Sequence, residues 1–296
     1  MNIKIITDSG MDLDKDLIEK YDIEVLNIPV IDSENEVLPE DMSADEFFEK
    51  MKEKEVYSTS QISEFEYRSC FSKYIEEKRE IIYISLSSGI SGTYNQAKMA
   101  QEGLLAEHPQ GKIHVFDSKS ATCGMGLLVA KAALMAQSGE SAEFILDELE
   151  FIREHNIHTF SVTTFEYLVR GGRVSKGAAT LGNLLNVRPV LEVSRSDGKL
   201  RKTAMVRGGN MLYKRIADGF ADVYSEEIKD QTICISYGDD IEIAHKIKAE
   251  LLKKTDFDEK NILIIQLGPV VGAHTGPGFL AIFFQNSIKD HRYQII

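Results

Sequence analysis

Up to about residue 160, short apolar runs alternate regularly with longer amphipathic stretches along this chain. The apolar runs have the length of β-strands, and the stretches between them have the apolar spacing of helices that bury one face. Buried strands separated by such helices predict a mostly parallel sheet with helices on both faces. We expect strands at residues 3–7, 24–30, 81–86, 113–116 and 157–162, and helices at residues 13–20, 44–52, 64–76, 93–105, 123–136 and 142–154.

Beyond residue 160 the pattern changes. Asp197-Gly198 lies between two alternating runs and predicts a hairpin over residues 190–206. The fold class we predict is α/β with two domains, a mostly parallel α/β (Rossmann-like) domain over residues 1–160 and a smaller α+β domain over residues 161–285 that closes over a ligand. Residues 286–296 are expected to form a loosely held tail. The other elements expected in the second domain lie at residues 165–169, 178–185, 212–223, 232–236, 241–252, 261–267 and 279–284.

The charge of the chain limits its partners. The net charge of −13 argues against nucleic acid or an anionic membrane surface as a general partner. Residues 170–215 are the exception, because they contain eleven Lys or Arg and two acids, a formal charge of +9. Such a segment is either a solvated basic face or a contact for an anion or an acidic protein.

The sequence also bears on localisation and on metals. No apolar run reaches the roughly 18 residues that span a bilayer, and residues 1–8 lack the features of a signal peptide. We therefore expect a cytoplasmic protein. The cysteines Cys70, Cys123 and Cys234 are far apart, and none lies near a histidine at metal-ligand spacing. They predict reduced structural cysteines and no metal site.

Residues 84–94 read as the end of a buried strand, a loop of glycine and hydroxyl residues, and the start of a helix. Glycine lets a ligand approach the backbone, and a helix N-terminus offers unpaired N–H groups with a partial positive charge. With Ser91 and its neighbouring hydroxyls, this arrangement suits a small anion such as a carboxylate or phosphate. An ordinary N-cap and tight turn is the alternative. Polar loops at 8–9 and 117–118 follow other strands, and such loops converge where parallel sheets bind ligands.

Three further segments carry polar side chains suited to the same anion. Residues 58–61, with three hydroxyls and an amide, precede a helix and can supply donors to a carboxylate. Arg170 lies between a helix end and paired glycines, where it either faces an anion or ends a helix on the surface. His274 stands in a tight loop of glycines and prolines at 267–278. We assign it to the site, with a structural role as the alternative.

Motifs for catalysis and for nucleotide binding are incomplete. The sequence at 89–93 departs from the G-x-S-x-G pattern of a nucleophile elbow, because it ends in Thr93. There is no Walker loop, and residues 124–126 lack the third glycine of a dinucleotide site. Two alternative hypotheses stay open: a lipid esterase or thioesterase that pairs Ser91 with His274, and a nucleotide- or phosphate-binding regulator built on the first domain.

Taken together and in order, these segments resemble the DegV family of bacterial fatty-acid-binding proteins over residues 3 to about 285. The resemblance implies one long-chain fatty acid at the domain junction, with its carboxylate bound by Thr59, Ser91 and Gly92. Arg170 and His274 would belong to the network around the carboxylate. The matching motifs are Thr7-Asp8-Ser9, Thr59-Ser60-Gln61, Ser87-Ser88-Gly89-Ile90-Ser91-Gly92-Thr93-Tyr94, Asp117-Ser118, Tyr167-Leu168-Val169-Arg170-Gly171-Gly172-Arg173 and residues 268–278.

One residue departs from the family pattern and one is assigned to a partner. Ile62 stands where proline often follows the glutamine in the family, which alters the rigidity of the loop that carries Thr59. Arg207 would correspond to a position outside the carboxylate site that helps partner contact or exchange. The apolar residues of 178–193 and 279–284 are our candidates for the lining of the acyl cavity.

The resemblance implies a carrier rather than an enzyme. Members of the family present the bound acid to a separate ATP-dependent fatty acid kinase, which phosphorylates the carboxylate for phospholipid synthesis. This chain would then need no cofactor apart from the bound fatty acid as ligand. It would bind no nucleic acid and would contact a membrane only transiently.

Overall fold

The computed structural model of the chain describes residues 2–39, 41–175, 177 and 186–296. Its first half is built on a four-stranded parallel sheet with the strand order β2-β1-β5-β6. The strands are β1 (Ile3–Asp8), β2 (Glu24–Leu26), β5 (Glu80–Ser85) and β6 (Ile113–Asp117). All six residues of β1 are buried, as expected of a central strand covered on both faces.

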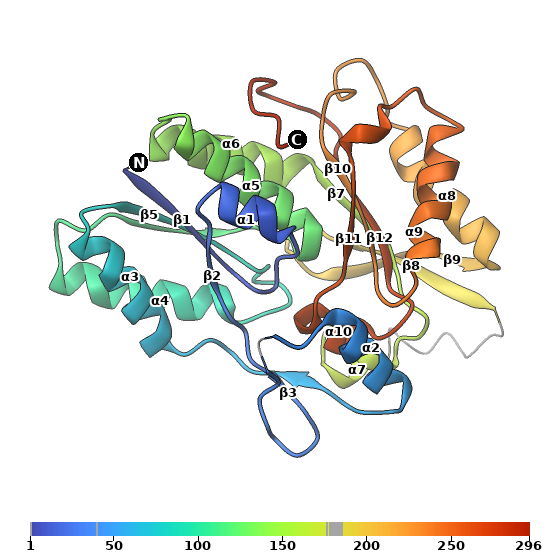
Figure 1. Cartoon of the computed structure of the whole chain (residues 1–296), viewed down its shortest axis with the longest axis horizontal. Coiled ribbons are helices and arrows are strands. Elements are labelled where there is room, and N and C mark those ends of the chain that lie inside the picture. The colour runs from blue at the N-terminus through green and yellow to red at the C-terminus, as the bar shows by residue number, and fades with distance from the viewer. Residues whose placement is uncertain (1, 40, 176, 178–185) are drawn as a thin grey trace.

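Helices cover both faces of this parallel sheet. Figure 1 shows α3 and α4 on one face and α1, α5 and α6 on the other. Ser63 begins α3 with a capping box to Glu66, and Ser141 caps α6. The predicted α/β architecture is confirmed, and these helices lie within a few residues of their predicted positions. Their bounds are α1 (Lys15–Lys20), α3 (Glu64–Glu76), α4 (Thr93–Glu107), α5 (Thr122–Gln137) and α6 (Ala142–His155).

The second half of the chain forms a mixed sheet with the strand order β11-β10-β12-β7-β8-β9. Among its pairs, β10 and β11 run parallel and the others run antiparallel. Helices α8 (Gly209–Ala221) and α9 (Ile241–Leu252) pack together beside it (Figure 1). The strands are β7 (Asn156–Ser161), β8 (Val187–Val193), β9 (Leu200–Arg207), β10 (Ile233–Tyr237), β11 (Ile262–Gln266) and β12 (Leu280–Gln285).

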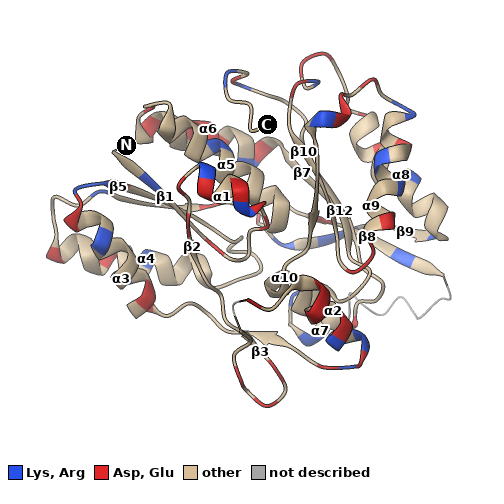
Figure 2. Ribbon diagram, viewed as in Figure 1, with Lys and Arg blue, Asp and Glu red and all other residues tan. Residues whose placement is uncertain are grey.

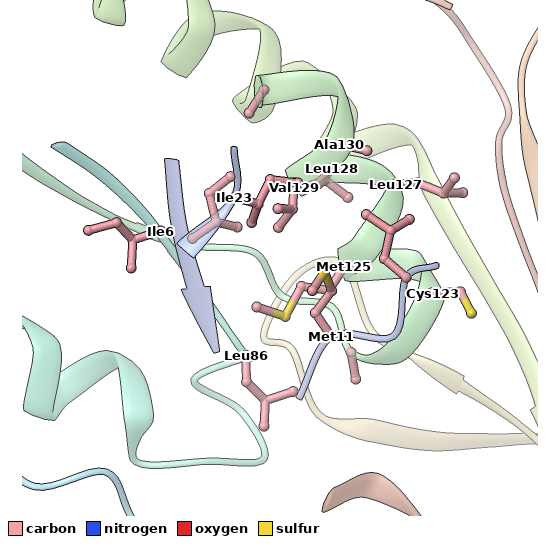
Figure 3. Close-up of a cluster of buried hydrophobic side chains, with 14 of the residues drawn as sticks. Ile6, Met11, Ile23, Leu86, Cys123, Met125, Leu127, Leu128, Val129 and Ala130 are labelled. Atoms are coloured by element: carbon pink, nitrogen blue, oxygen red, sulfur yellow. The ribbon is translucent and has the colours of Figure 1, made fainter. Parts of the chain in front are cut away.

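Helix α5 lies between the two sheets and is buried on almost every side. Figure 3 shows its residues Met125 and Val129 near Met11 and Ile23 of the first half. On its other side α5 contacts β7, β10 and β12 of the mixed sheet. A mostly apolar helix is expected in such a position, and the one charged residue of α5, Lys131, is buried in an ion pair with Glu148.

The strand predicted at 157–162 exists, but its place in the parallel sheet was wrong. As β7, it is antiparallel to both β12 and β8 in the mixed sheet. An apolar run indicates a strand without indicating its partner, since partners far along the chain are equally compatible with it. The division of the chain at residue 160 stays a prediction, although β7 already begins at Asn156.

A group of short elements packs beside the two sheets, in the lower part of Figure 1. Here the loop predicted at 267–278 is a helix, α10, with Pro269 at its start and Gly276, at φ +74°, after its end. Helix α10 contacts the other members of this group. The members are β3 (Val30–Ile31), β4 (Ser58–Thr59), α2 (Ala44–Lys52), α7 (Glu166–Arg170) and α10 (Pro269–Thr275).

The C-terminal residues are held against the first half of the chain, contrary to the loose tail that was predicted. The hydroxyl of Tyr21 donates to the carbonyl of Ile295 at 2.8 Å, and both Tyr293 and Ile295 are buried. The short helix predicted at 178–185 lies outside the described residues. In the part of the chain that is described, no helix is long and apolar enough to cross a membrane.

Candidate functional site

A cavity lies at the junction of the parallel sheet, the mixed sheet and helices α7 and α10. Its volume is about 90 Å³. We call this cavity the junction pocket. Its apolar lining is Ile28, Leu86, Ile90, Ala121, Phe160, Leu168, Val193, Leu200, Val270, Val271, Phe279 and Phe283, and its polar lining is Thr59, Ser60, Gln61, Ser91, Gly92, Thr122, Arg173, His274 and Thr275.

The loop between β5 and α4 forms one wall of the junction pocket. Asp8, at the end of β1, fixes the start of this loop by accepting a hydrogen bond from the backbone N–H of Leu86 at 2.9 Å. The hydroxyl of Tyr83 donates to the same carboxylate oxygen at 2.7 Å. Burial raises the pKa of Asp8 to about 6. The carboxyl group at the strand end is therefore a structural anchor for the loop.

The same loop delivers Ser91 to the N-terminus of α4. The hydroxyl of Ser91 contacts that of Thr93 and accepts from the Thr93 backbone N–H at 3.3 Å. Gly92 is the N-cap residue, and it has no side chain that could accept from the N–H groups of the first turn. A 15-residue helix that begins in this way offers N–H groups and a partial positive charge to an anion.

His274 of α10 meets Thr59 of β4 at the polar end of the pocket. The Nε2 atom of His274 lies 2.8 Å from the Thr59 hydroxyl oxygen. Burial, and then the positive charge of Arg173, lower the pKa of His274 to about 4, so the ring is neutral at neutral pH. The backbone of Gly171 lies directly against this ring, because a Cβ atom there would be 2.2 Å from Nδ1.

Arg173, rather than Arg170, is the arginine that lines the junction pocket. Its Nε donates to the carbonyl of Ile90 at 2.9 Å and its Nη1 to the carbonyl of Gly171 at 2.5 Å. Arg173 thereby connects the segment after α7 to the loop between β5 and α4. Burial lowers the pKa of Arg173, although a guanidinium stays charged at neutral pH.

Arg170 is turned toward its own helix. Its Nη2 donates to Glu166 at 2.7 Å, and its guanidinium lies 5.1 Å from the centre of the Tyr167 ring. The sequence could not separate the two arginines, because both flank the same pair of glycines. The deciding feature is the left-handed turn at Gly172, φ +73°, which redirects the chain between them. A role for Arg170 near the carboxylate stays a prediction.

Gln61 also belongs to the polar cluster, although it was not assigned a role of its own. A Cβ atom on Gly92 would lie 2.0 Å from the Gln61 amide nitrogen, so the glycine makes room for this side chain. The Gln61 oxygen accepts from the amide of Gln96 at 3.2 Å. The signal for Gln61 was its place in the Thr-Ser-Gln segment beside Thr59.

The structure therefore brings Thr59, Ser91, Gly92 and His274 into one pocket, as the sequence predicted for their positions. Their roles in binding stay predictions. Arg207 ends β9 as an exposed residue outside the pocket lining. Of the candidate lining segments, residues 178–185 lie outside the described residues. The others contribute Val193, Phe279 and Phe283 to the pocket wall.

The esterase hypothesis requires Ser91 and His274 to form a hydrogen-bonded pair. In the described residues the hydroxyl of Ser91 contacts Thr93, whereas His274 contacts Thr59. No hydrogen bond joins the two, so the arrangement does not favour a serine nucleophile. The described residues also hold no cluster of three or more His, Cys, Asp or Glu that could bind a metal ion.

The junction pocket is a mostly apolar cavity with a few polar side chains, which is the usual composition of a small-molecule binding site. Comparison with known proteins identifies the family. The model of the family described as "Uncharacterised protein, DegV family" matches residues 2–287. A DegV domain-containing protein of Clostridium perfringens is 34% identical over 97% of this chain and 98% of its own length. The chain belongs to the DegV family.

Solved structures of DegV family proteins resemble this chain over nearly its whole length. A DegV family protein from Thermus thermophilus, described by its fatty acid binding, has a TM-score of 0.85 and 29% identity, over 96% of this chain and all of its own. A stearic acid-binding protein from Eubacterium ventriosum has a TM-score of 0.84 and 26% identity, over 96% of this chain and 98% of its own. The predicted family and the predicted fold class are both confirmed.

Proposed function

We propose that this chain binds one long-chain fatty acid in the junction pocket. The carboxylate would lie among Thr59, Ser91, Gly92 and His274, and the acyl chain would lie among the apolar residues between the sheets. The observation that carries this proposal is the composition of the pocket, which combines twelve apolar residues with the hydrogen-bonded pair Thr59–His274 and with Arg173 and Ser91. The fatty acids bound by the related Thermus and Eubacterium proteins support the same ligand.

The two ends of the ligand contribute differently to the free energy of binding. Burying about 15 methylene groups at roughly 0.8 kcal/mol each gives on the order of 12 kcal/mol before the costs of ordering the chain are subtracted. Removing a carboxylate from water is costly, and donors at the polar end have to offset it. The Thr59 hydroxyl, the Arg173 charge and the α4 N-terminus, whose N-cap residue is a glycine, are suited to this task.

The experiment uses protein stripped of lipid and titrated with oleate or palmitate. We expect about one fatty acid per chain, recoverable by organic extraction and mass spectrometry. The double variant Thr59→Ala, Ser91→Ala is expected to bind about tenfold or more weakly, because two donors to a buried carboxylate are lost. Ser88→Ala is the matched control, since Ser88 donates to Asp117 outside the pocket lining. Absence of any uptake by the wild-type protein would refute the proposal.

We further propose that the bound acid is presented to a separate ATP-dependent kinase, which forms an acyl phosphate for phospholipid synthesis. The chain would act as a carrier, not as an enzyme, and would work in the cytoplasm, where ATP is available. Two features support this proposal. The sequence contains no Walker loop, and the net charge of residues 170–215 is +9 in a chain of −13. Figure 2 shows basic residues on β8, β9 and α8.

Arg207 provides the test of presentation. Arg207→Ala is expected to leave fatty acid binding unchanged and to lower acyl phosphate formation in a reaction reconstituted with a fatty acid kinase. Lys229→Ala is the control, because Lys229 is exposed and pairs with Glu226 outside the basic segment. Equal kinase rates for Arg207→Ala and the wild-type protein would remove Arg207 from the contact.

A further inference from the structure

A second cavity adjoins the junction pocket. We call it the outer cavity, and its volume is about 510 Å³. The residues that line both cavities are Ile90, Ser91, Gly92, Arg173 and Leu200. The outer cavity therefore borders Ser91 and Gly92, two of the residues among which the proposed function places the carboxylate.

The lining of the outer cavity is basic. Arg173 and Lys199 supply two positive charges, and no Asp or Glu among the described residues belongs to the lining. Two acids of adjoining loops lie outside it, and both have partners. Asp117 accepts hydrogen bonds from the loop after β5, and Asp197 pairs with Arg201. This balance of charge favours an anion in the cavity.

The two cations differ in what they can offer a ligand. Arg173 already donates to the carbonyls of Ile90 and Gly171, so it contributes mainly its charge. Lys199 lies just before β9 and is exposed. Its ammonium group has no hydrogen-bond or ion-pair partner in the described part of the chain, so its three N–H donors are available. Exposed lysines are common, but this one lines a cavity that adjoins the ligand site.

A free fatty acid would leave the outer cavity to water. Its last atoms are the carboxylate oxygens, which the proposed function places among Thr59, Ser91, Gly92 and His274. A further group attached to the carboxylate would need space beyond these residues. The outer cavity provides that space, because about 510 Å³ greatly exceeds the few water volumes, at about 30 Å³ each, that such a group displaces.

An acyl phosphate carries such a group. Its phosphoryl group follows the carbonyl group, and phosphate esters have a charge of about −1.5 to −2 at pH 7. Moving this charge out of water has to be offset by partners, and a lysine ammonium group binds phosphate as a point charge. The basic lining and the unpaired Lys199 meet this requirement.

We propose that the outer cavity is the subsite for the phosphoryl group of an acyl phosphate, and that Lys199 is the residue that recognises its charge. This inference rests on the proposed function, because the acyl chain and the carbonyl group would lie in the junction pocket as in the free acid. It adds a specificity. The chain binds an acyl phosphate more tightly than the fatty acid of the same length.

The test compares palmitate with a stable analogue of palmitoyl phosphate, the β-ketophosphonate in which a methylene group replaces the bridging oxygen. Both affinities are measured on the full chain by displacement of a fluorescent fatty acid. We expect the wild type to bind the analogue about tenfold or more tightly than palmitate. Lys199→Gln is expected to reduce this preference by about tenfold, because a charged donor is lost, and Lys199→Arg, which keeps the charge, to retain most of it.

Lys202→Gln is the matched control. Lys202 is an exposed lysine of β9 outside the lining of both cavities, so this variant removes the same charge and is expected to leave the preference unchanged. A second readout is the phosphorus nuclear magnetic resonance signal of the bound analogue. It is expected to titrate at a lower pH in the wild type than in Lys199→Gln, because a nearby ammonium group favours the doubly charged phosphonate.

The inference is overturned if the wild type binds the two ligands equally, if Lys202→Gln loses as much preference as Lys199→Gln, or if the phosphorus signal titrates alike in the wild type and Lys199→Gln. Inorganic phosphate is a separate arm. Binding of inorganic phosphate to palmitate-loaded protein through Lys199, without a preference for the analogue, would overturn the acyl phosphate as occupant. Palmitate binding without that preference refutes this inference alone, whereas absence of palmitate uptake refutes the proposed function as well.

Discussion

A single methyl group at Gly171 is predicted to disable the polar end of the junction pocket. Gly171 ends α7 with φ −71°, a helical conformation that alanine adopts without strain. The new Cβ atom would lie 2.2 Å from Nδ1 of His274 and 3.0 Å from Cε1. Both atoms belong to a rigid ring, so the whole ring has to withdraw. An ordinary contact begins near 3.4 Å, which requires a shift of about 1 Å.

That shift breaks the hydrogen bond between Thr59 and His274. Their polar atoms are 2.8 Å apart, and a further 1 Å places them beyond hydrogen-bonding distance. Leaving a buried polar group unpaired costs about 1–3 kcal/mol, which corresponds to roughly 5- to 150-fold in affinity. We therefore expect Gly171→Ala to weaken fatty acid binding within this range, measured by displacement of a fluorescent fatty acid.

The neighbouring glycine provides the control. Gly172 has φ +73° and no atom within 4 Å of an added Cβ, so Gly172→Ala strains the backbone without touching His274. We expect it to lower the free energy of unfolding by about 1 kcal/mol and to leave fatty acid affinity unchanged. The reasoning is refuted if Gly171→Ala binds as tightly as the wild type, or if Gly172→Ala loses as much affinity.

Three further predictions concern stability and the shape of the pocket. The pKa of His274 is lowered from 6.5 to about 4, so its contribution to the unfolding free energy is complete above pH 6.5 and is lost as pH falls toward 4, by up to about 3 kcal/mol. Urea unfolding of wild type and His274→Gln between pH 4 and 8 checks this, and parallel curves would contradict it. Phe283→Ala, at a side chain 3% exposed, is expected to cost about 3–5 kcal/mol and to shift ligand preference toward bulkier acyl chains, measured by unfolding and by competition between fatty acids. Truncation after Gln285 is expected to lower the melting temperature, because it removes the buried Tyr293 and Ile295; an unchanged value would show that these contacts contribute nothing.

Local patterns predicted the elements better than their partners. The run 64–76 behind its capping box is α3 to the residue, because a cap and an amphipathic period are local signals. The run 157–162 was recognised as a strand but placed in the wrong sheet, because β12, its partner, lies more than a hundred residues away. Helix α10 was missed for another reason. The glycines and prolines of this segment predicted a loop. In the structure, Pro269 begins a seven-residue helix and Gly276 follows its end.

The candidate site could be predicted in part for the same reasons. Ser91 and Gly92 sit in the loop after β5, at the strand ends that a parallel sheet brings together, whereas Thr59 lies on β4 in the small antiparallel pair. The choice between Arg170 and Arg173 depends on one left-handed glycine, and the sequence does not show which way the chain turns there.

The burial of α5 limits how a ligand could enter. This helix contributes to one continuous apolar core that includes Ile6 of the parallel sheet and Phe283 of the mixed sheet. Separating the two sheets would expose that core to water, at a free-energy cost of about 25 cal/mol for every Å² of apolar surface. The short elements around α10 belong to the same core through Phe48, Leu168 and Val270, so moving them would expose apolar surface as well. Any opening of the pocket would therefore carry this cost.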